Sequence, residues 1–68
     1  MSIKITSVLD PGDANPWPLE YHPIHFATRE AASLHFAREA RYSQEYADGD
    51  VLTISTADDS WRVIVSGH

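Results

Sequence analysis

Hydrophobic and polar residues alternate at the start of the chain. The run Ile3-Lys4-Ile5-Thr6 places both isoleucines on one side of an extended backbone, and this period of two is typical of a half-buried strand. The turn-forming residues Asp10-Pro11-Gly12-Asp13 follow soon afterwards. We therefore expect a strand over Ser2–Val8 that ends before this turn.

The stretch from Pro11 to Pro23 contains all four prolines of the chain. A proline has no backbone N–H to donate and holds the residue before it in an extended conformation, so regular structure is disfavoured there. We expect this stretch to be a loop. Ile24 and Phe26 then share one side of a short extended piece, which predicts a brief strand before the next element.

A helical period follows the loop. Thr28 is a suitable N-cap, Glu30 lies in the first turn, and arginines occur toward the other end, so the charges match the helix dipole. These signals predict a helix from about Arg29 to Tyr42 or slightly beyond. Small and aromatic residues recur at intervals of three and four and predict its buried face: Ala32, Phe36, Ala37 and Ala40.

The C-terminal part of the chain predicts a hairpin. Strands are expected over Val51–Thr56 and Trp61–Ser66, joined through Ala57-Asp58-Asp59-Ser60. The predicted register gives three pairs on the face beneath the helix: Thr56 with Trp61, Ile54 with Val63, and Leu52 with Val65. The other face is mainly polar with one apolar pair, Val51 and Ile64, which either marks a contact surface or is ordinary exposure of single apolar residues.

Together these elements predict a single α+β domain over residues 1–68. Its order is β-(β)-α-β-β, with a small antiparallel sheet of three or four strands and one helix packed on one face. A chain of 68 residues builds a thin core, and the absence of cysteine excludes disulfides and thiolate metal sites. Hydrophobic packing, as a monomer or a homodimer, must supply the stability.

The charge balance is acidic. Ten acidic residues against five basic ones give a formal net charge of −5, which disfavours direct phosphate binding and therefore direct nucleic-acid binding. The acidity either aids solubility only or forms a functional surface. Met1–Asp10 lacks the basic start and apolar stretch of a signal peptide, and no apolar run is long enough to span a bilayer. We expect a cytoplasmic protein with no membrane partner.

Residues with reactive or metal-binding side chains do not form a recognisable catalytic motif. His22 and His25 are three apart, but Pro23 makes a helix between them unfavourable, and in an extended segment they point to opposite faces. His35 and His68 add no ligand spacing typical of zinc sites. Asp58 and Asp59 fit a turn better than an acid/base pair, and the three glycines are isolated. We expect no metal, no cofactor and no enzymatic activity.

Two groups of residues are candidates for partner binding. The segment Asn15–Tyr21 holds Trp17 between two prolines and beside Tyr21. Trp17 either anchors an interface on a stiffened backbone or folds back over the thin core. Acidic side chains form the second group and offer an imitation of nucleic-acid phosphates to a basic protein groove: Asp48, Asp50, Asp58, Asp59, Glu30 and Glu39.

The order of elements resembles that of a known class of proteins. Four segments carry this resemblance: Ile3-Lys4-Ile5, Glu30-Ala31-Ala32-Ser33-Leu34-His35-Phe36-Ala37, Gly49-Asp50-Val51-Leu52-Thr53-Ile54 and Ser60-Trp61-Arg62-Val63-Ile64-Val65. They are similar in order and general character to small phage-encoded anti-CRISPR proteins that inhibit type I surveillance complexes. The resemblance implies a non-enzymatic inhibitor that blocks target-DNA binding by occupying a basic surface of the effector complex, in the host cytoplasm. The class is heterogeneous, so no functional residue carries over by motif.

Two other function classes stay open. One is a protein interaction or regulatory module, antitoxin-like or an accessory subunit, that uses Trp17, Tyr21 and the Val51/Ile64 face. The other is a very small enzyme or metal-binding domain. Salt-sensitive binding to a basic protein favours the inhibitor, a salt-insensitive apolar contact favours the module, and stoichiometric metal favours the third class.

Overall fold

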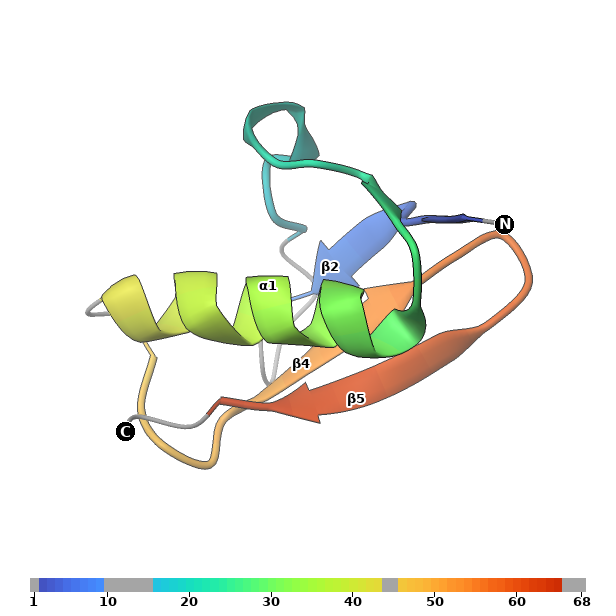
Figure 1. Cartoon of the computed structure of the whole chain (residues 1–68). Helices are drawn as coiled ribbons and strands as arrows, with labels where there is room; N and C mark the ends of the chain where they lie inside the picture. The colour runs from blue at the N-terminus through green and yellow to red at the C-terminus, as the bar shows by residue number, and fades with distance from the viewer. Residues whose placement is uncertain (1, 10–15, 44–45, 66–68) are drawn as a thin grey trace.

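The computed structural model describes residues 2–9, 16–43 and 46–65, and confirms the α+β fold. Helix α1 spans Arg29–Tyr42, the range that the sequence predicted. The Thr28 hydroxyl accepts a hydrogen bond of 3.1 Å from the backbone N–H of Ala31 and caps the first turn. Figure 1 shows α1 lying across the three-stranded sheet. The buried residues of the helix are Ala32, Phe36 and Ala40.

The N-terminal segment forms two short strands where one was predicted. Strand β1, Ile3–Lys4, pairs with β3, His25–Phe26, whereas β2, Ser7–Leu9, belongs to a separate sheet. The N–H of Ile5 donates to the carbonyl of Ile24 at 2.7 Å, and the next N–H donates to Ser55 at 2.8 Å. The chain therefore changes partners between residues 5 and 6, which divides the predicted strand.

The larger sheet is antiparallel, with the order β2-β4-β5. Strand β4 spans Val51–Ser55 and lies in the middle, and β5 spans Ser60–Ile64 at one side. A short 3-10 helix, η1 at Leu19–Tyr21, interrupts the loop before β3. The predicted three- or four-stranded sheet is thus a three-stranded sheet beside a two-stranded one.

The hairpin register differs from the prediction by two residues. Leu52 lies opposite Val63, and Ile54 lies opposite Trp61. The turn causes the difference, because the Thr56 hydroxyl accepts hydrogen bonds from the backbone N–H groups of Asp58 at 3.3 Å and Asp59 at 3.1 Å. The turn therefore begins at Thr56, one residue earlier than expected. A shift of two residues keeps each side chain on its predicted face, and four of the six predicted residues are buried: Leu52, Ile54, Val63 and Val65.

The core lies between α1 and the larger sheet. Phe36 is fully buried, and half-buried aromatic and aliphatic residues surround the core. Its buried members among the described residues are Ile5, Val8, Ala32, Phe36, Ala40, Leu52, Ile54, Val63 and Val65. Trp61 was predicted beneath the helix and is half-buried at the margin. Within the described ranges, no helix has the length and apolar character required to cross a bilayer.

Candidate functional site

Among the residues that the structure describes, strand β5 is an open edge of the sheet. Pairs that exchange hydrogen bonds alternate with pairs that do not along an antiparallel ladder. The N–H of Val65 donates to the carbonyl of Asp50 at 2.7 Å, so Val65 directs its backbone groups toward β4. Because this direction alternates along the strand, Trp61 and Val63 also direct their backbone groups toward β4. The backbone groups of Arg62 and Ile64 therefore point away from the sheet. Residues 2–9, 16–43 and 46–65 supply no partner for them.

The opposite edge of the same sheet is covered. The N–H of Trp17 donates to the carbonyl of Val8 at 2.8 Å, and Leu9 bridges to Pro16. The loop thus lies along β2 and pairs with the outward carbonyl of Val8. No described segment lies along β5 in this way.

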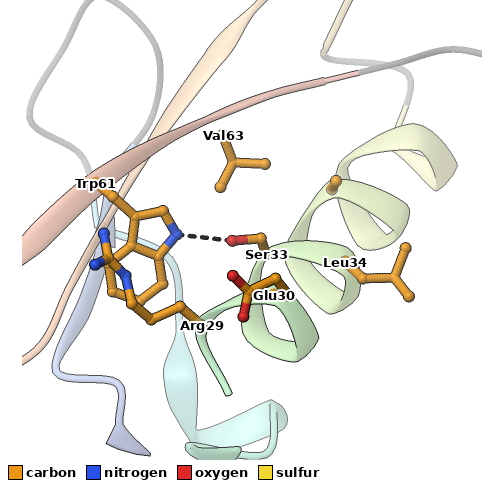
Figure 2. A pocket seen from close by; sticks show the side chains of 7 residues that line it. Arg29, Glu30, Ser33, Leu34, Trp61 and Val63 are labelled. Atoms are coloured by element: carbon orange, nitrogen blue, oxygen red, sulfur yellow. Dashed lines mark hydrogen bonds between the residues drawn. The ribbon is translucent and has the colours of Figure 1, made fainter.

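A groove runs between β5 and α1, directly beside the open edge. Figure 2 shows the side chains of Trp61 and Val63 reaching from β5 toward the helix, where Trp61 Nε1 donates a hydrogen bond of 2.7 Å to Ser33 Oγ. The groove is lined by Arg29, Glu30, Ser33, Leu34, Ala37, Trp61 and Val63. Most of this lining is apolar, and Leu34 is 58% exposed. The groove therefore presents an apolar surface into which a side chain fits.

Charged side chains lie around Trp61 at one end of the groove. The guanidinium carbon of Arg29 lies 4.7 Å from the centroid of the Trp61 ring, and Nη1 lies 3.3 Å from Asp59 Oδ2. The positive charge of Arg29 is therefore compensated by the face of an aromatic ring and by a carboxylate. Glu30 is exposed beside it and forms no ion pair with another described residue. The remaining charge at the groove is negative.

A second candidate site lies on the other flank of α1. His22 Nδ1 is 3.3 Å from His35 Nε2 and 3.8 Å from Glu39 Oε1. One ligand atom from each of these three residues lies within 4.8 Å of the other two. His35 and Glu39 are one helical turn apart on α1, whereas His22 comes from the loop after η1. Two imidazoles and a carboxylate are a common donor set for zinc.

Aromatic rings fix the orientation of this histidine cluster. The His35 ring packs at right angles to Phe36 with centroids 4.9 Å apart, and His22 lies between Trp17 and Phe36 at 5.7 and 5.6 Å. Burial lowers the pKa of the His35 imidazole; neighbouring Glu39 opposes this shift, whereas His22 and Arg38 add to it. His35 is therefore held toward its neutral form, the form that has a free ring nitrogen.

The acidic residues predicted to bind a partner have unequal roles. Asp50 Oδ2 accepts the backbone N–H of Ala47 at 2.9 Å, and Asp59 Oδ1 accepts that of Ser60 at 2.8 Å, so both hold local turns. Asp48 and Asp58 are exposed. Glu30 lies at the groove and Glu39 in the histidine cluster, so the six carboxylates do not form one continuous patch.

The two aromatic candidates also separate. Trp17 packs against Phe36 and Tyr46, with ring centroids 5.8 Å apart in each case, and covers the core. Of the two interpretations of Trp17, the one in which it folds back over the core therefore matches its position. Tyr21 is 80% exposed and lies at the end of η1.

Sequence reasoning missed the two most organised sites. It compared His22 with His25, but the structure places His22 beside His35, thirteen residues away, and His25 stays exposed in β3. The spacing of His35 and Glu39 on one helical face was a usable signal. The open edge was not visible in the sequence, because it depends on which strand is last in the sheet.

The comparisons with known proteins give no relative. No family model matches the chain, and no curated protein or solved structure matches it.

Proposed function

We propose that this chain is a non-enzymatic binding protein that takes up an extended segment of a partner protein along β5. The proposal rests on one observation: the outward backbone groups of Arg62 and Ile64, which no described residue pairs, lie beside an apolar groove on the same strand. Addition of a strand to an open edge satisfies those groups, and the groove receives every second side chain of the added segment. Main-chain pairing then supplies affinity, and the groove supplies selectivity.

The chemistry of the groove defines the segment. Trp61, Val63 and Leu34 favour aliphatic or aromatic side chains at alternate positions. Glu30 at the groove, together with the net charge of −5, favours lysine or arginine in the segment and steers a basic partner toward this side. The expected ligand is therefore a short extended stretch in which apolar and basic residues are interspersed.

Selection from a random peptide library displayed on beads tests this function. Peptides that bind the wild-type protein are expected to share the interspersed apolar and basic pattern and to bind the Arg62→Thr variant as well. They are expected to lose binding to Arg62→Pro, because proline removes the outward N–H while leaving the inward pairing of β5 with β4 in place. Far-UV circular dichroism establishes that both variants fold.

Two results contradict the proposal. One is that no shared pattern emerges from the selection. The other is that the selected peptides bind Arg62→Pro and Arg62→Thr equally well, since contact with the groove alone does not need the backbone edge. Leu34→Lys is expected to weaken binding by filling the groove with a positive charge, whereas Tyr42→Lys, at an exposed position outside the groove lining, serves as its matched control.

A second candidate function is the inhibitor of a CRISPR surveillance complex, working through acidic side chains. The exposed positions of Asp48, before β4, and Asp58, in the turn after it, favour this role. The double change Asp48→Asn with Asp58→Asn removes two charges without touching the turn hydrogen bonds of Asp50 and Asp59. Weaker binding to a purified type I effector complex, most evident at low salt, is expected for this function. Unchanged binding at every salt concentration contradicts it.

A further inference from the structure

We infer that His22, His35 and Glu39 bind one Zn²⁺ ion, with the fourth coordination position left to a small ligand such as water. None of these three residues lines the groove beside β5. The inference therefore does not depend on the proposed function. It replaces the expectation from the sequence that no metal is bound.

The distances fit tetrahedral zinc. Two nitrogens that each lie about 2.0–2.1 Å from zinc at the tetrahedral angle are separated by about 3.3–3.4 Å. His22 Nδ1 and His35 Nε2 are 3.3 Å apart, the separation expected for two nitrogens that bind one ion. Glu39 Oε1, at 3.8 Å from His22 Nδ1, needs only a small side-chain rotation to join them. Its side chain is 40% exposed and has the freedom to make that rotation.

The fold holds the two nitrogen donors in place. Thr28 caps α1, and the Phe36 ring packs against both histidines, so the helix and the core fix His35. The backbone N–H of His22 donates to the carbonyl of Leu19 at 3.0 Å, which fixes the start of the segment that follows η1. Ligand atoms that the fold already orients lose little freedom on binding, and this favours affinity.

Space for a fourth ligand adjoins the cluster. A hollow of about 310 Å³ is lined by Pro16, Trp17, Pro18, His22, Glu39, Ser43 and Tyr46. Two of the three proposed ligands are therefore part of its wall. A water molecule occupies about 30 Å³ in the liquid, so the hollow has ample room for one on the open side of the ion.

Nitrogen and carboxylate donors narrow the choice of ion. Imidazole suits zinc, copper, iron and nickel, whereas calcium and magnesium prefer oxygen donors alone. The tetrahedral separation of the two imidazole nitrogens favours zinc among these. Bound zinc would connect the segment that contains His22 to α1. The two histidine ligands, His22 and His35, are thirteen residues apart in the chain.

Titration of the metal-free protein with zinc chloride, in competition with a chromophoric chelator, tests the inference. One ion per chain and a raised Tm are expected, and EDTA is expected to reverse the rise. His35→Gln and Glu39→Gln should each weaken binding by more than about tenfold. Cobalt(II) in place of zinc should give the strong visible absorption of a tetrahedral site.

Matched variants separate this site from adventitious binding. His25→Gln and Glu30→Gln remove an exposed histidine and an exposed glutamate outside the cluster and are expected to bind zinc like the wild type. Circular dichroism confirms that each variant folds before titration. The inference is overturned if no saturable complex of one ion per chain forms. It is also overturned if His35→Gln binds like the wild type, or if His25→Gln loses as much affinity.

Discussion

Trp61 Nε1 donates a hydrogen bond of 2.7 Å to Ser33 Oγ, and this bond joins the open edge strand to the helix that covers the sheet. The indole lies half-buried at the margin of the core, with the Arg29 guanidinium over its face. Trp61 thus connects the two walls of the groove through the hydrogen bond to Ser33 and the contact with Arg29.

Removal of the hydroxyl tests the contact. Ser33→Ala leaves the half-buried indole N–H without its acceptor, and this should lower the free energy of unfolding by about 0.5–1.5 kcal/mol. Urea denaturation followed by tryptophan fluorescence measures the change. Ser33→Thr keeps the hydroxyl and is expected to recover part of the loss. An unchanged urea midpoint for Ser33→Ala would show that water replaces the serine without penalty.

Phe36 is the largest side chain in the core that the structure buries completely. Phe36→Ala should lower the free energy of unfolding by about 3–5 kcal/mol, because it removes apolar contacts and leaves a cavity. A loss of that size is most of the stability of a small domain, so the variant should be largely unfolded at 37 °C. Leu34→Ala on the same helix is the control, since Leu34 is 58% exposed and should cost far less. Equal losses in the two variants would contradict the packing of α1.

The two aspartates of the hairpin turn should respond differently to neutralisation. Asp59 accepts the backbone N–H of Ser60 and pairs with Arg29, whereas the Asp58 carboxylate contacts no such partner among the described residues. Asp59→Ala should therefore lower the Tm more than Asp58→Ala does. Differential scanning fluorimetry at low and high salt measures both, and the part due to the Arg29 ion pair should shrink as salt rises. Identical melting curves for the two variants would contradict a structural role for Asp59.

Gly49 lies just before β4 with a φ of +92°, a conformation that side chains other than glycine adopt only with strain. A Cβ added there meets no heavy atom within 4 Å, so the backbone alone determines the penalty. Gly49→Ala should lower the free energy of unfolding by roughly 1–2 kcal/mol. Gly49→Asn should lower it less, because asparagine tolerates a positive φ better. Thermal unfolding of both variants gives the order, and a stabilised Gly49→Ala would refute it.

Local interactions were the predictable part of the fold. Helix α1 matched its predicted range because the Thr28 cap and the three- and four-residue spacing are local signals. The face of each hairpin strand was also predictable, since alternation survives a register shift of two. The register itself was not, because a single hydroxyl, that of Thr56, decides where the turn begins.

Interactions between distant segments were the unpredictable part. The change of partner after Ile5 depends on backbone carbonyls at residues 24 and 55. The histidine cluster depends on a loop that returns His22 to the helix, and no spacing rule links it to His35. Of the candidate partner-binding residues, Glu30 was placed at the groove and Glu39 in the cluster, whereas Trp17 serves the core.

The cover that Trp17 places on β2 also limits how copies of this chain can assemble. Sheets that are open at both sides can add subunits without end, and that is the route to fibres. Here the carbonyl of Val8 already accepts the N–H of Trp17, so a strand added beside β2 would have to displace the loop, whereas β5 has no strand beside it among the described residues. Two copies that pair through β5 leave a covered strand at each outer side. Self-association through β5 would therefore pair two copies and use the edge that each one presents.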